Sequence, residues 1–191
     1  DLMAAHDELC MVLEQEAVLP KPQRKALQNL LDDLASGDLM DAQERYILLF
    51  DRTRSLSLHL FEHVHGESRD RGQAMVDLIK VYEDGGYSPT TAELPDFLPL
   101  FLEYASTLSP TQAIELIGQP SHVFGALRER LKKRGSVYEA VFAALIQLSQ
   151  AELDEDMIAR LLAEPDPEQD DLEALDAVWA MDAEFADATF E

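Results

Sequence analysis

The apolar residues of this chain recur every three or four positions along most of its length, and no segment shows the strict alternation of a half-buried strand. Leu27, Leu30 and Leu34 illustrate this spacing. The pattern therefore predicts an all-α fold. The expected helices are a first segment that ends near Pro20, a second that ends at Ser36-Gly37, and further helices over 39–50, 56–64, 69 to about 85, 97–105, 111–117, 120–134 and 137–148.

Three polar residues stand where predicted helices begin. Asp38 precedes the helix over 39–50, and Ser68 precedes the one that runs toward Gly85-Gly86. Both residue types commonly accept a hydrogen bond from the first turn of a helix. Asp96 is predicted to cap the next helix, because Pro99 then falls in the first turn, where a missing N–H is tolerated.

The last forty residues differ from the rest in charge. From Glu152 to Glu191 there are fifteen acidic residues and one basic residue, Arg160. We predict one helical domain over residues 1–164 and an acidic, partly mobile C-terminal tail over residues 165–191. Four apolar residues at helical spacing predict one amphipathic helix in this tail: Leu172, Leu175, Val178 and Trp179.

The whole chain is strongly acidic, with 38 acidic and 15 basic residues and a formal net charge of −23. Phosphate backbones and anionic lipid headgroups repel such a surface, so neither nucleic acid nor direct membrane insertion is expected. A basic polypeptide segment is the predicted partner. Cys10 is the only cysteine and no apolar run is long enough for a membrane span, which together with the absence of an export signal predicts a cytoplasmic protein.

One short pattern suggests metal chemistry. His59, Glu62 and His63 spell H-x-x-E-H, a spacing that one class of zinc proteases uses with the glutamate as base. A metal-dependent hydrolase is therefore an alternative interpretation. We favour the simpler one, in which these side chains pair with nearby arginines, because such an enzyme needs a third, distant ligand. Cys10, with His6 four positions away, is not favoured as a nucleophile.

Charged and aromatic residues cluster in the middle of the chain. The arginines are expected to form an ion-pair network between helices, and the aromatic residues to lie in the core or along a groove that receives an amphipathic helix. The arginines are Arg45, Arg52, Arg54, Arg69 and Arg71, with Asp51, Glu62, Glu67 and Asp70 as their partners. The aromatic residues are Tyr46, Phe50, Phe61, Phe97, Phe101 and Tyr104.

Three stretches carry a family resemblance. The stretch LFEHVHGESRDRGQAM over residues 60–75 resembles the signature region of the nitrate reductase molybdenum cofactor assembly chaperones, the NarJ family, also called the nitrate reductase delta subunit. ELPDFLPLFLEY over 93–104 resembles the second hallmark of the wider TorD-like family that matures redox enzymes, and LDAVW over 175–179 also matches. The wider family tends to carry Asp-His in that hallmark, whereas this chain has Asp96-Phe97, so only Asp96 can inherit a role.

The resemblance implies a compact, single-domain helical bundle and a role in assembly, without catalysis and without a cofactor or metal of its own. Such chaperones bind the basic N-terminal segment of the apo catalytic (alpha) subunit of nitrate reductase and support molybdenum cofactor insertion before membrane attachment. A monomer is favoured. An acidic scaffold that acts mainly through its tail is a further alternative.

We predict that the peptide lies as a helix in a groove between residues 46–64 and 96–104. The expected apolar wall consists of Tyr46, Leu49, Phe50, Leu56 and Leu60. The expected acceptors for basic side chains of the peptide are Glu62, Glu67, Asp96 and Glu103.

Overall fold

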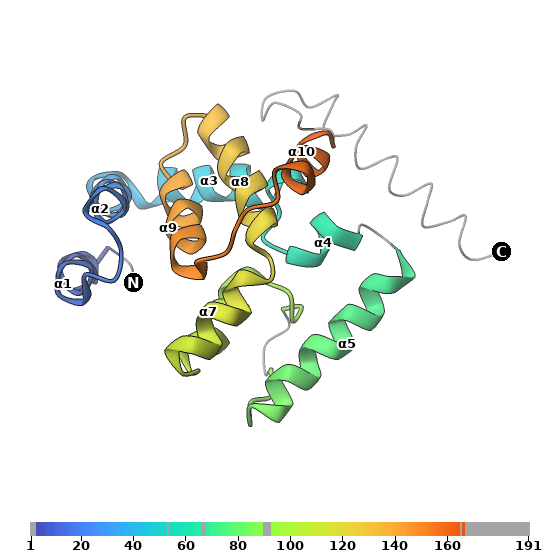
Figure 1. The fold of residues 1–191 in the computed structure, drawn as a ribbon. Coiled ribbons are helices and arrows are strands. Elements are labelled where there is room, and N and C mark those ends of the chain that lie inside the picture. The colour runs from blue at the N-terminus through green and yellow to red at the C-terminus, as the bar shows by residue number, and fades with distance from the viewer. Residues whose placement is uncertain (1–2, 53, 66–67, 90–92, 165, 167–191) are drawn as a thin grey trace.

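The computed structural model describes residues 3–52, 54–65, 68–89, 93–164 and 166 (Figure 1). Within these ranges every regular element is helical, which confirms the predicted all-α class. The first half of the chain forms α1 (His6–Glu16), α2 (Lys21–Ser36), α3 (Leu39–Phe50), a 3-10 turn (Arg54–Leu56), α4 (Leu60–His65) and α5 (Arg69–Asp84). The second half forms α6 (Leu98–Ser106), α7 (Pro110–Gly118), α8 (Ser121–Lys133), α9 (Glu139–Ser149) and α10 (Glu155–Leu162).

Helix α8 is the centre of the fold. It packs against α9 along one side and against α10 and the 3-10 turn on others, while α7 and α2 extend the contacts of α9 (Figure 1). Apolar residues occupy several faces of α8, and four of them are fully buried: Val123, Phe124, Leu127 and Leu131. A helix that is apolar on several faces is stable only where neighbours cover all of them.

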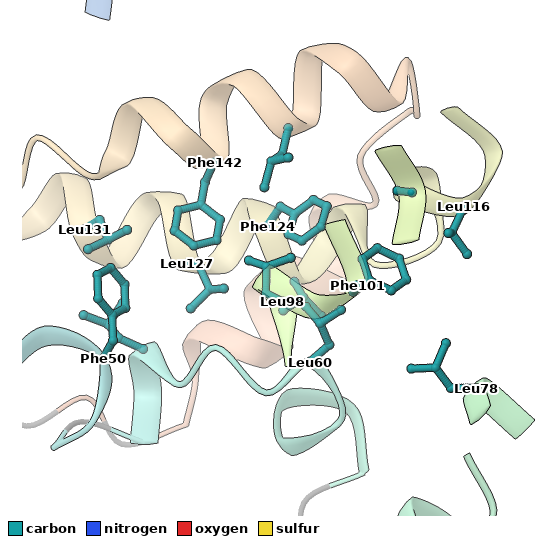
Figure 2. Close-up of a cluster of buried hydrophobic side chains, with 14 of the residues drawn as sticks. Phe50, Leu60, Leu78, Leu98, Phe101, Leu116, Phe124, Leu127, Leu131 and Phe142 are labelled. Atoms are coloured by element: carbon teal, nitrogen blue, oxygen red, sulfur yellow. The ribbon is translucent and has the colours of Figure 1, made fainter. Parts of the chain in front are cut away.

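The buried side chains form one cluster around this helix (Figure 2). Phe124 and Leu127 of α8 lie beside Phe142 of α9, and Phe50, at the end of α3, reaches the same cluster near Leu131. The core therefore joins segments from both halves of the chain, as expected for a single folded unit.

The predicted caps have three different outcomes. Asp38 caps α3 as predicted, because its Oδ1 accepts a hydrogen bond from the N–H of Met40 at 2.8 Å. Ser68 does precede α5, but its side chain makes no capping bond. The prediction that Asp96 caps α6 is wrong. The residue before this helix is Phe97, and the side chain of Asp96 serves a different helix.

A single helix over 56–64 was also predicted, and the structure divides this segment. A 3-10 turn ends at Leu56, the chain then runs extended, and α4 begins at Leu60. The extended part pairs with the segment before α6: the N–H of Leu98 donates to the carbonyl of Leu58 at 2.8 Å, and that of Leu60 to the carbonyl of Asp96 at 3.1 Å. This pairing uses backbone groups that a continuous helix would have occupied.

Helix α10 (Glu155–Leu162) was not among the predicted helices, although it lies within the predicted helical domain over residues 1–164. Asp154 caps it by accepting from the N–H of Met157 at 3.0 Å, and Ile158 is buried against α8. The approach is close: a Cβ on Gly125 of α8 would lie 2.6 Å from Cδ1 of Ile158. The predicted tail helix over 172–179 lies outside the described residues.

A buried arginine joins three of these elements. Arg130 of α8 is 2% exposed, and its guanidinium donates to the carbonyl of Ser55 at 2.7 Å and to that of Leu161 at 2.6 Å. Burial lowers the pKa of this guanidinium, while the nearby Asp166 raises it. None of the helices in the described ranges is long and apolar enough to cross a lipid bilayer.

Candidate peptide-binding surface

Helix α3 carries more apolar side chains than the core can cover. Its inner face buries Ala42, Leu49 and Phe50, whereas Leu39 and Ile47 are 50% and 46% exposed. Apolar residues on a second face of a surface helix mark a potential contact with another molecule.

The exposed face of α3 forms one side of a groove of about 670 Å³, which we call the α3 groove. Its lining is mostly apolar and comes from α2, α3, the N-terminal turn and the residue before α9: Met3, Leu34, Leu39, Ala42, Gln43, Tyr46, Ile47, Asp51 and Tyr138. An apolar groove of this kind can accept the apolar face of an amphipathic helix.

A second hollow of about 270 Å³, the α4 cavity, adjoins the α3 groove through Asp51, which lines both. The α4 cavity is more polar, and its lining consists of Phe50, Asp51, Arg54, Ser57, Leu58, His59, Glu62 and Phe97. The exposed carboxylate of Asp51 therefore stands where an apolar surface meets a polar one.

Three aromatic rings, those of Tyr46, Phe50 and Tyr138, pack together where this surface meets the core. The ring centroids of Tyr46 and Phe50 are 5.0 Å apart, and Tyr138 meets the rings of Phe50 and Tyr46 edge-on at 5.2 and 6.2 Å. Burial raises the pKa of Tyr46, and the neighbouring carboxylate of Asp51 raises it further. The phenol is therefore neutral at physiological pH and offers a ring face together with a hydroxyl group.

Asp96 lies behind the α4 cavity, where it is fully buried. Its Oδ2 accepts a hydrogen bond from the N–H of Phe61 at 2.9 Å, which caps the first turn of α4 from a distant segment. Its Oδ1 lies 3.4 Å from Nδ1 of His59 and has no hydrogen-bond partner among the described residues. Asp96 thus joins α4 to the segment before α6, and its second oxygen lies beside His59 at the wall of the cavity.

The structure separates the predicted binding residues into groups. Tyr46, Phe50 and Glu62 lie along the α3 groove and the α4 cavity. Leu56 and Leu60 are core residues, 0% and 3% exposed, and no peptide can reach them in this conformation.

The remaining predicted residues lie elsewhere. Leu49 is buried and borders another hollow of about 320 Å³ with Arg45 and Arg134. Glu103 is exposed and borders a hollow of about 230 Å³ beside Tyr82 and Tyr104. Glu67 lies outside the described residues.

Sequence reasoning missed several residues that line this surface. Leu39, Ile47, Asp51 and Leu58 were not selected. Leu39 was placed on the same apolar stripe as Leu49, but the structure leaves Leu39 half exposed and buries Leu49. The available signal was the number of apolar positions on α3, which exceeds what one buried face requires.

The predicted ion-pair network is present in part. Arg71 of α5 lies 3.1 Å from a carboxylate oxygen of Glu62 in α4, as expected. Arg45 pairs instead with Asp33 of α2 at 2.7 Å. The two pairs join different helices: Arg71 links α5 to α4, and Arg45 links α3 to α2.

The H-x-x-E-H pattern does not form a metal site in this structure. His59 precedes α4 and faces Asp96, whereas His63 is buried with its Nε2 2.8 Å from the carbonyl oxygen of Ser57. Burial lowers the pKa of His63. In the described part of the chain, the donor atoms of His59, Glu62 and His63 do not gather into a group that could hold an ion.

The described residues form an all-helical body with an apolar groove beside a polar cavity, a surface that can accept an amphipathic helix. The model of the family described as "Nitrate reductase delta subunit" matches residues 16–144, and the chain belongs to this family.

Curated relatives agree with this assignment. The chain is 47% identical over 161 residues to the nitrate reductase molybdenum cofactor assembly chaperone NarJ of Escherichia coli K12, which covers 84% of this chain and 68% of that protein. It is 41% identical over 179 residues to the probable chaperone of the same description, NarW, from the same strain, covering 93% and 77%. A probable NarJ of Bacillus subtilis is 30% identical over 123 residues, covering 64% and 67%.

Proposed function

We propose that this protein is an assembly chaperone of a respiratory nitrate reductase. In this proposal it binds the basic N-terminal segment of the apo catalytic subunit in the cytoplasm and supports molybdenum cofactor insertion before the enzyme attaches to the membrane. The names of its relatives support the assembly role. The observation that supports the peptide-binding role is the α3 groove, an apolar surface that the described residues leave uncovered.

The apolar part of the proposal rests on α3. A peptide helix laid along the groove would cover Leu39, Tyr46 and Ile47, whose exposed area contributes nothing to the folded core. Burial of apolar surface stabilises such a complex by about 25 cal/mol per Å². Part of this gain offsets the entropy lost when a short peptide becomes helical, so a few large anchors must carry the affinity.

The polar part of the proposal rests on the α4 cavity. Asp51 and Glu62 offer carboxylates to a basic side chain of the peptide at the end of the groove. Glu62 already pairs with Arg71, so it is the weaker acceptor, whereas Asp51 is exposed. Asp96 acts indirectly, because it caps α4, which carries Glu62. Glu103 borders a separate hollow and is proposed only as an additional contact.

The experiment is a calorimetric titration of the protein with the N-terminal peptide of the catalytic subunit. Leu39→Ala and Ile47→Ala should each weaken binding by more than about 1 kcal/mol while the far-ultraviolet circular dichroism stays unchanged. Met40→Ala is the matched control, because Met40 lies on the same helix, is 76% exposed and does not line the groove. Equal effects of all three variants would place the peptide elsewhere.

The same titration tests the charge contribution. Affinity should fall as the salt concentration rises from about 0.1 M, where the screening length is about 10 Å, to about 1 M, where it is about 3 Å. Asp51→Asn should reduce this salt dependence, whereas the apolar contribution should remain. Binding that is indifferent to salt would remove charge complementarity from the proposal.

A further inference from the structure

Three side chains with different donor atoms converge where α1 meets α2. Nε2 of His6 lies 2.9 Å from Oδ1 of Asp32 and 3.7 Å from Sγ of Cys10. The three donor atoms all lie within 4.8 Å of one another, and no other group of this kind occurs among the residues that the structure describes. None of these side chains belongs to the α3 groove or the α4 cavity.

The helical hairpin itself produces this convergence. His6 and Cys10 are four residues apart on α1 and therefore share one face of that helix. At the opposite end of the hairpin, Arg24 of α2 pairs with Glu14 of α1 at 2.9 Å, which fixes the antiparallel register. This register places Asp32 beside the first turn of α1, at the open end of the hairpin, away from the loop that connects the two helices.

Apolar packing against the other described residues contributes little to the position of helix α1. None of its residues is buried, so apolar packing contributes less to its attachment than to that of α8 or α9. A bound ion at the open end would link α1 to α2 across 26 positions of the sequence.

The geometry suits a tetrahedral zinc ion. With Zn–N and Zn–O distances of about 2.0 Å and a Zn–S distance of about 2.3 Å, neighbouring ligand atoms of such a site are roughly 3.3–3.7 Å apart. The distance from Nε2 of His6 to Sγ of Cys10, 3.7 Å, already lies in this range. The distance from Nε2 to Oδ1 of Asp32, 2.9 Å, must lengthen slightly, which a rotation of one side chain can provide. Nδ1 of His6 lies 2.9 Å from Oδ1 of Asp7, the second carboxylate that zinc-bound histidines commonly have.

We propose that His6, Cys10 and Asp32 form a three-ligand Zn²⁺ site that fastens α1 to α2, with water in the fourth position. Imidazole and thiolate donors favour zinc over magnesium or calcium, which prefer oxygen ligands. The side chains of His6 and Asp32 are 24% and 55% exposed, which leaves an open side for ion and water.

Binding of the ion displaces protons, which pass to solvent. The ion takes the place of any proton on Nε2 of His6, while Nδ1 donates to Oδ1 of Asp7. The Cys10 thiol loses its proton and binds as thiolate, and no residue changes its oxidation state.

The experiment is a titration of the untagged, reduced protein with Co²⁺ and then with Zn²⁺. Tetrahedral cobalt bound by a thiolate should give a near-ultraviolet charge-transfer band that saturates at one ion per chain and disappears when zinc displaces it. Cys10→Ser should abolish the band, and His6→Ala and Asp32→Ala should each weaken binding more than about tenfold. Glu8→Gln is the matched control, an acidic residue of the same helix outside the cluster, and should bind like the parent.

Amide hydrogen exchange distinguishes an ion that stabilises the attachment of α1 to α2 from an ion that binds without affecting it. In the parent protein, zinc should slow amide hydrogen exchange across residues 6–16, and in Cys10→Ser it should not. The proposal is overturned if no charge-transfer band forms, if the Glu8→Gln control weakens binding as much as the ligand variants, or if zinc leaves exchange in α1 unchanged. Circular dichroism of each variant verifies that it is folded.

Discussion

Helices α8 and α3 are both rich in apolar residues, yet the fold uses them differently. Along α8 the apolar side chains Val123, Phe124 and Leu127 are completely buried between α9, α10 and the 3-10 turn. Along α3 the core takes Leu49 and Phe50, while Leu39 and Ile47 remain about half exposed. Apolar residues on α8 therefore stabilise the fold, whereas those on the outer face of α3 stay exposed among the described residues and mark a potential contact surface.

The largest expected effect is in the core. Leu127→Ala should lower the free energy of unfolding by about 3–5 kcal/mol, because it leaves a cavity that rigid neighbours cannot fill. Ile47→Ala on α3 should lower it by less than about 1 kcal/mol. Urea unfolding followed by circular dichroism measures both values, and similar losses would mean that α3 has no spare apolar face.

The next effect concerns the charge that α8 buries. Arg130→Ala should lower the free energy of unfolding by about 3 kcal/mol, because the carbonyls of Ser55 and Leu161 each lose a charged donor inside the protein. Arg128→Ala is the comparison on the same helix: its side chain is 37% exposed and pairs with Glu139 at 2.7 Å, so its loss should be below about 1 kcal/mol. If Arg128→Ala is the more damaging change, the buried arginine does not hold α8 to α10.

A third effect separates the two faces of α3 itself. Tyr46 is half-buried and lines the α3 groove, so Tyr46→Ala should weaken peptide binding by more than about 1 kcal/mol with most of the stability retained. Phe50 is 7% exposed, and Phe50→Ala should act mainly on stability, by about 3 kcal/mol. Parallel unfolding and calorimetric titrations measure both quantities, and a reversed ranking would exchange the assigned roles.

The sequence predicted contacts between residues that are close in the chain better than contacts between residues that are far apart in it. Helix positions follow from local spacing, and Asp38 caps α3 as predicted because the donor and the acceptor are two residues apart. Asp96 was assigned to the wrong helix because its partner, the N–H of Phe61, is 35 positions away. A residue's local context does not reveal such long-range pairings.

The binding residues were harder to predict for a related reason. Periodicity identifies Leu56 and Leu60 as apolar positions on a helical spacing but does not distinguish a core wall from a groove wall, and both are core residues here. The convergence of His6 and Cys10 with Asp32 likewise depends on how α1 folds back on α2. In both cases the decisive quantity is the position of another helix.

The smallest expected effect is a pH dependence that arises at His63, on the core side of the α4 cavity. Burial lowers its pKa below the ordinary value of 6.5. As the pH falls, the unfolded chain therefore binds a proton at a higher pH than the folded protein does. The contribution of His63 to stability is complete above the unfolded pKa and is lost as the pH falls through the folded pKa.

The variant His63→Gln tests this contribution, because its amide can still donate to the carbonyl of Ser57 but does not titrate. Unfolding free energies between about pH 5 and pH 8 should therefore fall more steeply on acidification in the parent than in the variant. His6 and His122 are common to both proteins and cancel in the difference. Parallel curves would show that the pKa of His63 is the same in the folded and unfolded states, as it would be if the α4 segment opened to water.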